Sequence, residues 1–260
     1  MIYYGVMVDK LLFEMLLVGV ILFYLSLKNF EIEKELGIAS IRAFIQIFAI
    51  ALLLGVIISI NHPLYTISVL GGMMLFAAHI ARKRVPSTAG FYKASVFGVS
   101  LGSTIVIIYA AFLNIFPIDA RYIIPFGSMV IANAMNSTAL GLNRLIAEVK
   151  AHRNSIESKL SLGVPSNIAV KPHVIDSVKA SLIPAISTLE ALGLVWIPGT
   201  MSGMILGGAD PIWAAQYQLF VSFSIFTANT IASIAATYLA TRYIFTKYHQ
   251  FSEEFLRSLI

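Results

Sequence analysis

Long apolar segments, separated by short polar or proline-containing breaks, run along almost the whole chain. Seven of them approach or reach the roughly 17 to 25 residues that an α-helix needs to cross a bilayer. They are Leu11–Leu27, Ala39–Ile60, Leu64–Ile80, Ala94–Leu113, Ile123–Leu142, Leu182–Ile197 and Ala214–Ile234. The breaks include residues 61–63, 82–86, 114–121 and 198–211. The pattern predicts an all-α, polytopic membrane protein with about seven transmembrane helices.

The stretch from Arg144 to Lys179 is the only long hydrophilic interruption of this pattern. Within it, Asn154 and Glu157 have the spacing of a capping box, which predicts that a short helix starts there. Ile156 and Leu160 are one helical turn apart, so we expect both on one face of that helix. The stretch therefore has the features of a folded element on the aqueous side rather than of a linker.

Gly163 and Pro165 predict where this short helix ends. Glycine adopts the left-handed conformation that closes many helices, and proline cannot continue one. A second short helix carrying Ile168 is expected to follow, so that Val164 and Ile168 form an apolar corner. The spacing alone leaves two interpretations open, which are a docking element for another protein and an amphipathic loop on lipid headgroups.

The composition supports the membrane assignment. Hydrophobic residues make up 58% of the chain and charged residues 12%, and the mean hydropathy is +0.84; soluble domains are far more polar. The chain has no cysteine, which excludes disulfides and thiolate metal sites. Asp9 and Lys10 precede the first apolar segment, and no small-residue cleavage signature follows it, so we expect a retained span.

Lysine and arginine residues are distributed unequally between the two sides of the predicted bundle. If the N-terminus lies outside, all of the 18 lysines and arginines except Lys10 and Arg121 fall on the cytoplasmic side or at its edge. The positive-inside rule then predicts an external N-terminus, a cytoplasmic C-terminus and a cytoplasmic loop over residues 143–181. We expect a multi-pass protein of the cell inner (plasma) membrane, whose positive charge faces anionic membrane lipid and not nucleic acid.

Two sequence motifs for nucleotide binding and metal-dependent hydrolysis are absent. The chain contains no phosphate-binding Gly-x-x-x-x-Gly-Lys-Ser/Thr loop and no His-Glu-x-x-His. The five histidines, His62, His79, His152, His173 and His249, are far apart in the sequence, so we expect no histidine metal cluster. The sequence predicts no catalytic residue and no cofactor in this chain.

Residues around the hydrophilic stretch resemble those of one transporter family. Glu157 followed by Gly163 resembles the Glu-Ala-Ala-x-x-x-Gly loop of ABC-transporter permeases, with Ser158 and Lys159 in place of the alanines. The sequence on either side of these two residues is similar to that of the iron-export ABC permease family of bacteria, whose plant relatives are aluminium-tolerance permeases. The matching positions are residues 124–136, Arg144, Glu148, residues 156–163, residues 193–208, Pro211, Tyr217 and Gln218, with Arg42, Gln46 and Gly55 upstream.

The resemblance implies that residues 1–260 form a single permease domain that acts as a homodimer with an ABC ATP-binding subunit, which binds ATP and Mg. It implies export of iron or another metal, coupled to the ATPase through the 154–170 loop. An organic solute such as a nucleotide sugar, and an ATP-independent carrier, are the alternatives. The residues expected to couple the loop to the ATPase are Glu157, Gly163, Val164, Pro165 and Ile168.

The segment between Pro198 and Pro211 is too short to cross the bilayer, so it predicts a half-helix or re-entrant turn. Every fourth residue in it is a glycine, at Gly199, Gly203 and Gly207, and such a stripe lets another backbone approach closely. Met204 replaces the glutamine that is usual in the family, which leaves the choice of substrate open.

A few polar or sulfur-containing residues at predicted membrane depth are candidates for a substrate path. Glu190 is placed midway along the sixth predicted span, where an unpaired charge is costly. With Met201 and Met204 it is a candidate metal site, and pairing with Arg42 is an alternative role. Asn133 and Gln46 complete the candidate path, although interhelical hydrogen bonding is the simpler role for Asn133.

Overall fold

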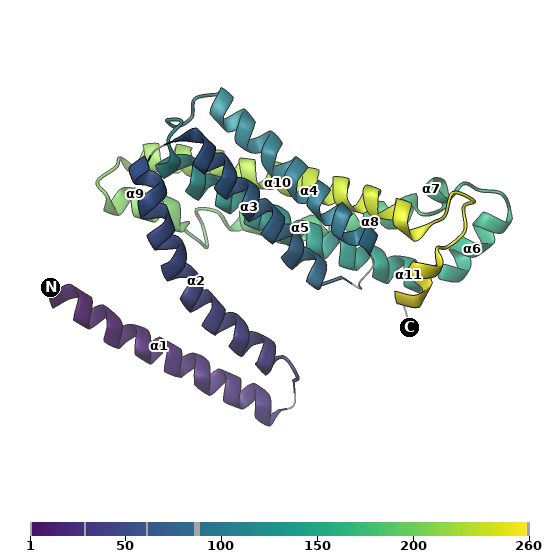
Figure 1. Cartoon of the computed structure of the whole chain (residues 1–260), viewed down its shortest axis with the longest axis horizontal. Helices are drawn as coiled ribbons and strands as arrows, with labels where there is room; N and C mark the ends of the chain where they lie inside the picture. Colours follow the sequence, from purple (N-terminus) through teal and green to yellow (C-terminus); the bar gives the residue numbers. More distant parts are fainter. Residues whose placement is uncertain (1, 29, 61, 86–88, 259–260) are drawn as a thin grey trace. The chain divides into compact units, whose positions relative to one another are not determined.

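The computed structural model describes residues 2–28, 30–60, 62–85 and 89–258, which form helices through most of their length (Figure 1). Within these residues, β-structure is limited to two isolated bridges, Leu192 to Trp196 and Phe245 to Phe251. The chain divides into two compact units, residues 1–60 and 61–260. The prediction of an all-α protein is confirmed.

The first unit is a helical hairpin of α1 (Ile2–Leu27) and α2 (Glu33–Ile60). Glu33 and Glu35 occupy the first turn of α2, where a negative charge is favourable beside the positive end of the helix dipole. Glu31 in the connecting turn has a φ of 59°, a left-handed conformation that reverses the chain direction.

The second unit is a bundle of nine described helices. They are α3 (Pro63–Lys83), α4 (Ala89–Phe112), α5 (Ala120–Ala151), α6 (Arg153–Ser161), α7 (Ser166–Ala169), α8 (Lys171–Ala191), α9 (Gly199–Leu206), α10 (Pro211–Ile244) and α11 (Glu253–Ser258). α10 packs against α4, α5, α8 and α9, and α3 packs against α4 and α5. The long helices α5 and α10 are therefore central to the unit.

Side-chain caps explain why three of these helices start where they do. The ring of His62 accepts a hydrogen bond from the N–H of Leu64 at the start of α3. Asp119 and Asp210 cap α5 and α10 in the same way, accepting from N–H groups of the first turn. The predicted breaks around these positions are confirmed, although the break residues Asn61 and Pro86 lie outside the described residues.

Small residues allow α4 and α10 to approach closely. A Cβ atom at Gly98 would lie 2.6 Å from the carbonyl oxygen of Ala232, and one at Gly102 would lie 2.6 Å from that of Ala228. Ala228 and Ala232 are fully buried at this contact. The helices are thus held by a small-residue seam, a common packing mode between membrane helices.

Five described helices are long and apolar enough to cross a membrane, and they are α2, α3, α4, α5 and α10. A shorter apolar helix covers Phe13–Leu27. The predicted span Leu182–Ile197 is wrong in its bounds, because α8 starts at Lys171 and ends at Ala191. Lys171, Asp176 and Lys179 make its first half polar, which leaves only a short apolar half.

The helices α5 and α10 are longer than a membrane span requires. They have 32 and 34 residues, or about 50 Å each at 1.5 Å per residue, against a hydrocarbon core of about 30 Å. The short helices α6, α7 and α11 cluster at the C-terminal ends of α5 and α10, while α9 lies at the opposite end of the unit (Figure 1).

Candidate functional site

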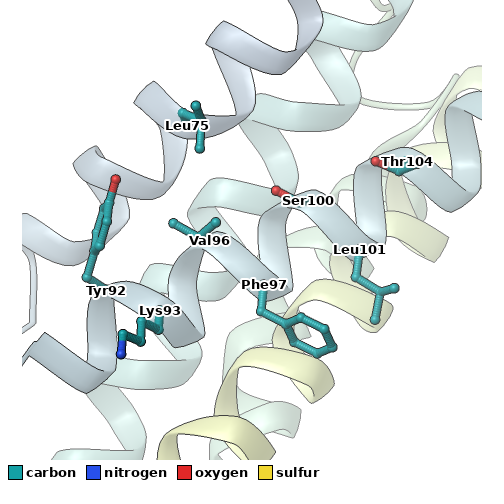
Figure 2. Close-up of a pocket in the computed structure, with 8 residues that line it drawn as sticks. All are labelled: Leu75, Tyr92, Lys93, Val96, Phe97, Ser100, Leu101 and Thr104. Carbon is teal, nitrogen blue, oxygen red and sulfur yellow. The ribbon is translucent and has the colours of Figure 1, made fainter.

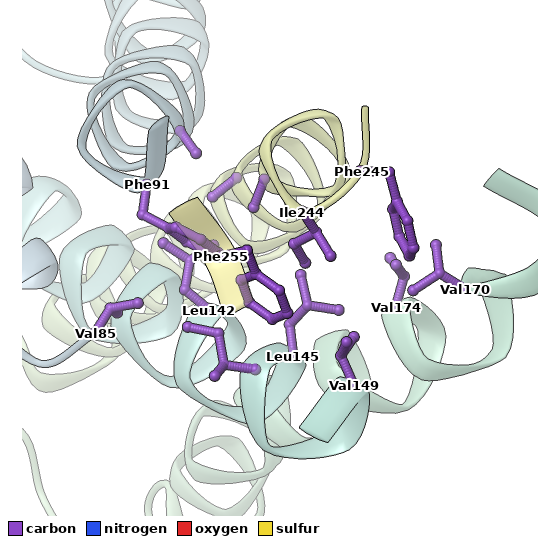
Figure 3. Close-up of a cluster of buried hydrophobic side chains, with 14 of the residues drawn as sticks. Val85, Phe91, Leu142, Leu145, Val149, Val170, Val174, Ile244, Phe245 and Phe255 are labelled. Atoms are coloured by element: carbon purple, nitrogen blue, oxygen red, sulfur yellow. The ribbon is translucent and has the colours of Figure 1, made fainter. Parts of the chain in front are cut away.

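The α6–α7 segment (residues 153–170) rests on a cluster of buried apolar side chains from α5, α8, α10 and the C-terminal residues (Figure 3). Ile156 of α6 is fully buried in this cluster, and Leu160, one turn later, packs against it. The other members include Leu142, Leu145, Val149, Val170, Val174, Ile244, Phe245 and Phe255. The predicted apolar face of α6 is confirmed, and it fixes the segment to the bundle.

The capping box predicted at Asn154 and Glu157 is wrong. α6 follows α5 directly, with His152 as its N-cap, so Asn154 is already inside the helix. Glu157 instead accepts a hydrogen bond from Nε of Arg153, at 2.8 Å to Oε1. The capping box does not form because α6 follows α5 with only His152 between them, whereas a capping box needs Asn154 to be a non-helical residue before the first turn.

Gly163 ends α6 as predicted. Its φ is +84°, its N–H donates to the carbonyl of Leu160, and the N–H of Val164 donates to the carbonyl of Lys159. This pair of bonds is a Schellman motif. Pro165 then serves as the N-cap of α7, so the chain turns sharply between the two short helices.

The exposed apolar residues of the α6–α7 segment differ in part from the predicted corner. Ile168 is 57% exposed, whereas Val164 is partly buried and packs against the buried cluster. Leu162, which the sequence analysis did not single out, is 83% exposed. The apolar surface of the segment is therefore made by Leu162 and Ile168.

The C-terminal residues support the segment from the other side, which the sequence analysis missed. Phe255 of α11 is fully buried and stacks on Phe91 and Phe251, with ring centroids 6.4 and 6.1 Å apart. Nδ1 of His249 accepts a hydrogen bond from the N–H of Ser166 at the start of α7. The recurrence of aromatic residues in an otherwise polar tail was the available signal.

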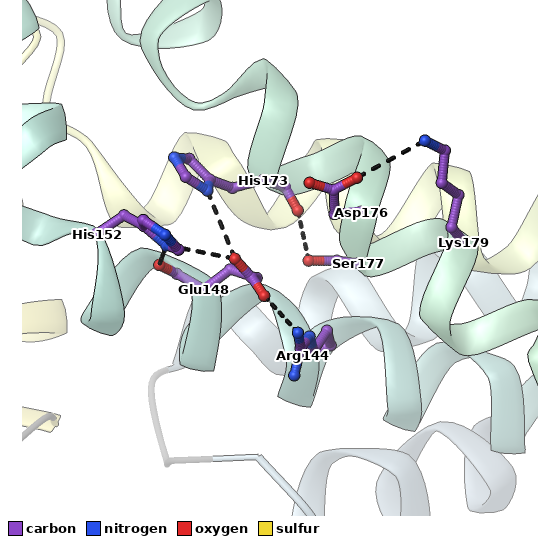
Figure 4. Close-up of polar contacts among 7 residues, drawn as sticks. All are labelled: Arg144, Glu148, His152, His173, Asp176, Ser177 and Lys179. Atoms are coloured by element: carbon purple, nitrogen blue, oxygen red, sulfur yellow. Dashed lines mark hydrogen bonds and ion pairs between the residues drawn. The ribbon is translucent and has the colours of Figure 1, made fainter.

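A polar cluster joins the end of α5 to the start of α8 (Figure 4). Glu148 Oε1 lies 2.6 Å from a guanidinium nitrogen of Arg144, and Oε2 lies 3.3 Å from Nδ1 of His152 and 3.6 Å from Nδ1 of His173. The expectation that the histidines form no cluster is wrong, because packing of α5 against α8 brings together residues that are distant in sequence.

Burial perturbs one member of this polar cluster. The pKa of His173 is lowered, first because burial disfavours its charged form and next because His152 is close. Glu148 opposes this shift by its hydrogen bond and its negative charge. The two imidazole rings stack with centroids 4.7 Å apart, so the cluster combines two imidazole groups with one carboxylate.

Glu190 does not lie midway along a span. It is exposed in the last turn of α8, one residue before the helix ends at Ala191. Met201 and Met204 are partly buried on α9, and Thr200 Oγ1 beside them lies 4.0 Å from the sulfur of Met129 in α5. The metal site predicted from Glu190, Met201 and Met204 stays a prediction.

The short helix predicted after Pro198 is present as α9, an eight-residue helix. Its glycines do not make the predicted close contact within the described chain. A Cβ at Gly199 or Gly203 would meet no atom within 4 Å, and one at Gly207 would meet only the backbone of α9 itself. The close helix contact lies at Gly98 and Gly102 instead, where Gly-x-x-x-Gly was the available signal.

The remaining path candidates belong to different compact units, Asn133 to the second and Gln46 to the first. The amide of Asn133 donates to the carbonyl of Met129 within α5, rather than to a neighbouring helix, and Gln46 is exposed on α2. Two buried residues of α10 were missed, Gln218 and Asn229, whose side-chain oxygens have no hydrogen-bond donor among the described residues. Unmet buried polar atoms are costly and require an explanation.

A groove of about 630 Å³ runs along α3 and α4 (Figure 2). It is lined by Leu75, Tyr92, Lys93, Val96, Phe97, Ser100, Leu101 and Thr104. Apart from Lys93 at one end and the hydroxyl groups of Tyr92, Ser100 and Thr104, the side chains that line it are hydrocarbon. The groove thus suits hydrocarbon better than a hydrated cation.

Comparison with known proteins places this architecture in a family. The model of the uncharacterised protein family UPF0014 matches residues 8–245. The chain is 31% identical to the UPF0014 membrane protein YjkA of Bacillus subtilis, over 94% of this chain and 99% of that protein. It is 30% identical to the probable iron export permease protein FetB of Escherichia coli, over 93% of both chains.

A plant protein is similarly related. The protein ALUMINUM SENSITIVE 3 of Arabidopsis thaliana is 32% identical over 90% of this chain and 85% of its own length. No solved structure matches the chain. With matches that cover both compact units, this multi-span membrane protein belongs to the uncharacterised protein family UPF0014.

Proposed function

We propose that this chain is the membrane-spanning permease subunit of an ABC transporter that exports a metal ion, with iron as the first candidate. The name of the Escherichia coli relative, a probable iron export permease protein, supports the substrate class. The lack of a phosphate-binding loop in the sequence is consistent with a partner that binds ATP and Mg. We further propose that both compact units act as one permease domain in the inner membrane.

The α6–α7 segment is the observation that carries this proposal. Ile156 anchors α6 in the buried cluster, while Leu162 and Ile168 stay exposed on the same short segment. A rigid support under exposed apolar side chains is what a helix needs if it is to insert into a groove of a partner protein. The partner we propose is an ABC ATP-binding subunit.

The support of this segment also suggests how movement passes from the ATPase to the membrane. α6 continues directly from α5, and α7 is followed directly by α8. Both α5 and α8 pack against α10. A shift of the docked α6–α7 segment would therefore move three helices together, as coupling through packed, rigid elements requires.

We add two candidates for the substrate path, Gln218 and Asn229. The candidates from the sequence are Glu190, Met201, Met204, Asn133 and Gln46. The buried side-chain oxygens of Gln218 and Asn229 on α10 have no hydrogen-bond partner in the described part of the chain. They are hard-donor atoms that a cation passing through the bundle can use. Since two permease chains are expected for two ATPases, we propose a homodimer.

The proposal is tested by co-expressing the chain with a tagged ATP-binding subunit of an iron-export ABC transporter. We expect the two chains to co-purify, and ATP hydrolysis in proteoliposomes to be stimulated by Fe²⁺. A nucleotide sugar that stimulates hydrolysis while metals do not would redirect the proposal to an organic solute. Solute movement by the permease alone, without ATP, would instead support a carrier and overturn the ABC assignment.

A further inference from the structure

Glu148, His152 and His173 place three potential metal ligands beside the start of α6 (Figure 4). Glu148 and His152 are one helical turn apart at the end of α5, and His173 lies in the first turn of α8. One ligand atom from each residue lies within 4.8 Å of those of the other two. Two helices thus converge on a common point with three donor groups.

The separations between these atoms suit a metal ion. Zn–N and Zn–O bonds of about 2.1 Å in a tetrahedral arrangement put neighbouring ligand atoms about 3.4 Å apart. Glu148 Oε2 is 3.3 Å from Nδ1 of His152 and 3.6 Å from Nδ1 of His173. The ligand atoms of all three residues lie within 4.8 Å of one another, so an ion that binds all three would draw the two imidazoles together.

The two imidazole rings also lie close enough to act together. They stack with ring centroids 4.7 Å apart, and Nδ1 of His152 also lies 3.0 Å from the backbone carbonyl oxygen of Glu148. An ion bound at this nitrogen would replace that contact.

Arg144 orients the carboxylate for this role. Its guanidinium binds Oε1 of Glu148 at 2.6 Å, and this leaves Oε2 directed at the two histidines. Groups that hold a ligand from behind are typical of metal sites. His152 is exposed while His173 is buried, so the cluster has one side open to water or to an incoming ion.

We propose that Glu148, His152 and His173 form a binding site for a divalent first-row transition metal ion. Two imidazoles and one carboxylate, with at least one position left for water, suit Zn²⁺, Fe²⁺ or Co²⁺. Mg²⁺ and Ca²⁺ prefer sites made of oxygen ligands, so a site with two imidazole nitrogens and one carboxylate does not suit them. The binding claim does not depend on the identity of the transported solute.

A bound ion would tie the α6–α7 segment to the rest of the bundle. His152 is both the C-cap of α5 and the N-cap of α6, and His173 follows α7 closely. The ion therefore bridges the two ends of the segment that we propose docks the ATPase. This regulatory role rests on the proposed function: occupancy of the site would set how rigidly the docking segment is held.

The site is tested with the full chain, purified in detergent and stripped with a chelator. We expect Co²⁺ to bind at one ion per chain with visible ligand-field absorption, and excess Mg²⁺ to leave this absorption unchanged. His173→Ala and Glu148→Gln are each expected to weaken Co²⁺ binding by more than about tenfold. His79→Ala is the matched control, because His79 is exposed on α3, outside the cluster.

A second variant separates loss of a ligand from loss of the fold. His173→Cys keeps a ligand at the same place, so it is expected to bind Co²⁺ with a new thiolate charge-transfer band. Absence of this band in folded His173→Cys protein, or undiminished Co²⁺ binding by the double variant His152→Ala/His173→Ala, would overturn the site. Co-purification with the ATP-binding subunit is measured on the same samples, so failure of metal binding and failure of the proposed function are distinguished.

Discussion

The imidazole of His249, in the residues that follow α10, caps the start of α7 by accepting a hydrogen bond of 3.2 Å from the N–H of Ser166. The hydroxyl of Ser166 lies 2.9 Å from the same nitrogen. The bond joins residues 83 positions apart. It gives a partner to a backbone N–H at the start of α7, where the N-cap residue makes no side-chain hydrogen bond. The C-terminal residues are therefore part of the α6–α7 structure.

His249→Gly is expected to loosen α7. Glycine tolerates the positive φ of 59° at this position, and it has no side chain to accept the hydrogen bond. Loss of a cap costs about 1 kcal/mol, so amides of residues 166–170 should exchange with solvent about fivefold faster or more. Exchange measured by mass spectrometry checks this, with His249→Asn as the control, because Oδ1 of asparagine keeps an acceptor in the place of Nδ1. Unchanged exchange in α7 would show that the cap is dispensable.

Gly163→Val is expected to destabilise the turn between α6 and α7. The φ of +84° costs a residue with a Cβ about 1–2 kcal/mol, and a β-branched side chain is the least suited to it. Gly163→Asn should retain most of the stability, because asparagine adopts this conformation. Thermal unfolding and pull-down by the ATP-binding subunit compare the two variants. Equal losses in both would point to a requirement for small size rather than for conformation.

Leu162→Asp and Ile168→Asp are expected to abolish association with the ATP-binding subunit while leaving the chain folded. Both side chains are largely exposed, so a charge there costs little until a partner covers it. Ile156→Asp should instead reduce folding itself, because Ile156 is fully buried and an unpaired charge in that cluster costs several kcal/mol. Co-purification and size-exclusion profiles measure both effects. Normal association of both exposed-site variants would contradict the docking surface.

Val164→Asp is expected to combine the two effects. Val164 packs against the buried cluster, so it belongs partly to the support and not only to the exposed surface. The variant should show both a lower unfolding temperature and weaker association, and it is less informative as a test of docking than Leu162→Asp. A fully stable Val164→Asp protein would place this side chain on the docking surface alone.

Gly98→Ala is expected to destabilise the α4–α10 contact. The added Cβ would lie 2.6 Å from the carbonyl oxygen of Ala232, and the helices must separate to admit it, at about 1–3 kcal/mol. Gly72→Ala on α3 is the matched control, because a Cβ there meets no atom within 4 Å and alanine favours helix by up to about 1 kcal/mol. Thermal unfolding in detergent measures both. A neutral Gly98→Ala would contradict the close seam.

The sequence predicted those features that depend on local chemistry. Hydrophobic length identified a multi-span helical protein, and the predicted breaks at residues 114–121 and 198–211 precede the long helices α5 and α10. The end of α6 at Gly163 was also predicted, because a left-handed helix stop favours glycine whatever surrounds it. Predictions from the sequence were wrong where packing overrode a local pattern. At Asn154, for example, α6 starts directly after α5 and no capping box forms.

By itself, then, the sequence determined the class of the protein, several helix limits and the place of the polar α6–α7 segment, since apolar length and glycine conformation act within a few residues. Only the tertiary structure decided that Glu148 meets His173, that His249 caps α7 and that Leu162, not Val164, is exposed. These relationships join residues from separate helices. They follow from how α5, α8, α10 and the C-terminal residues pack together, and no spacing along the chain encodes that packing.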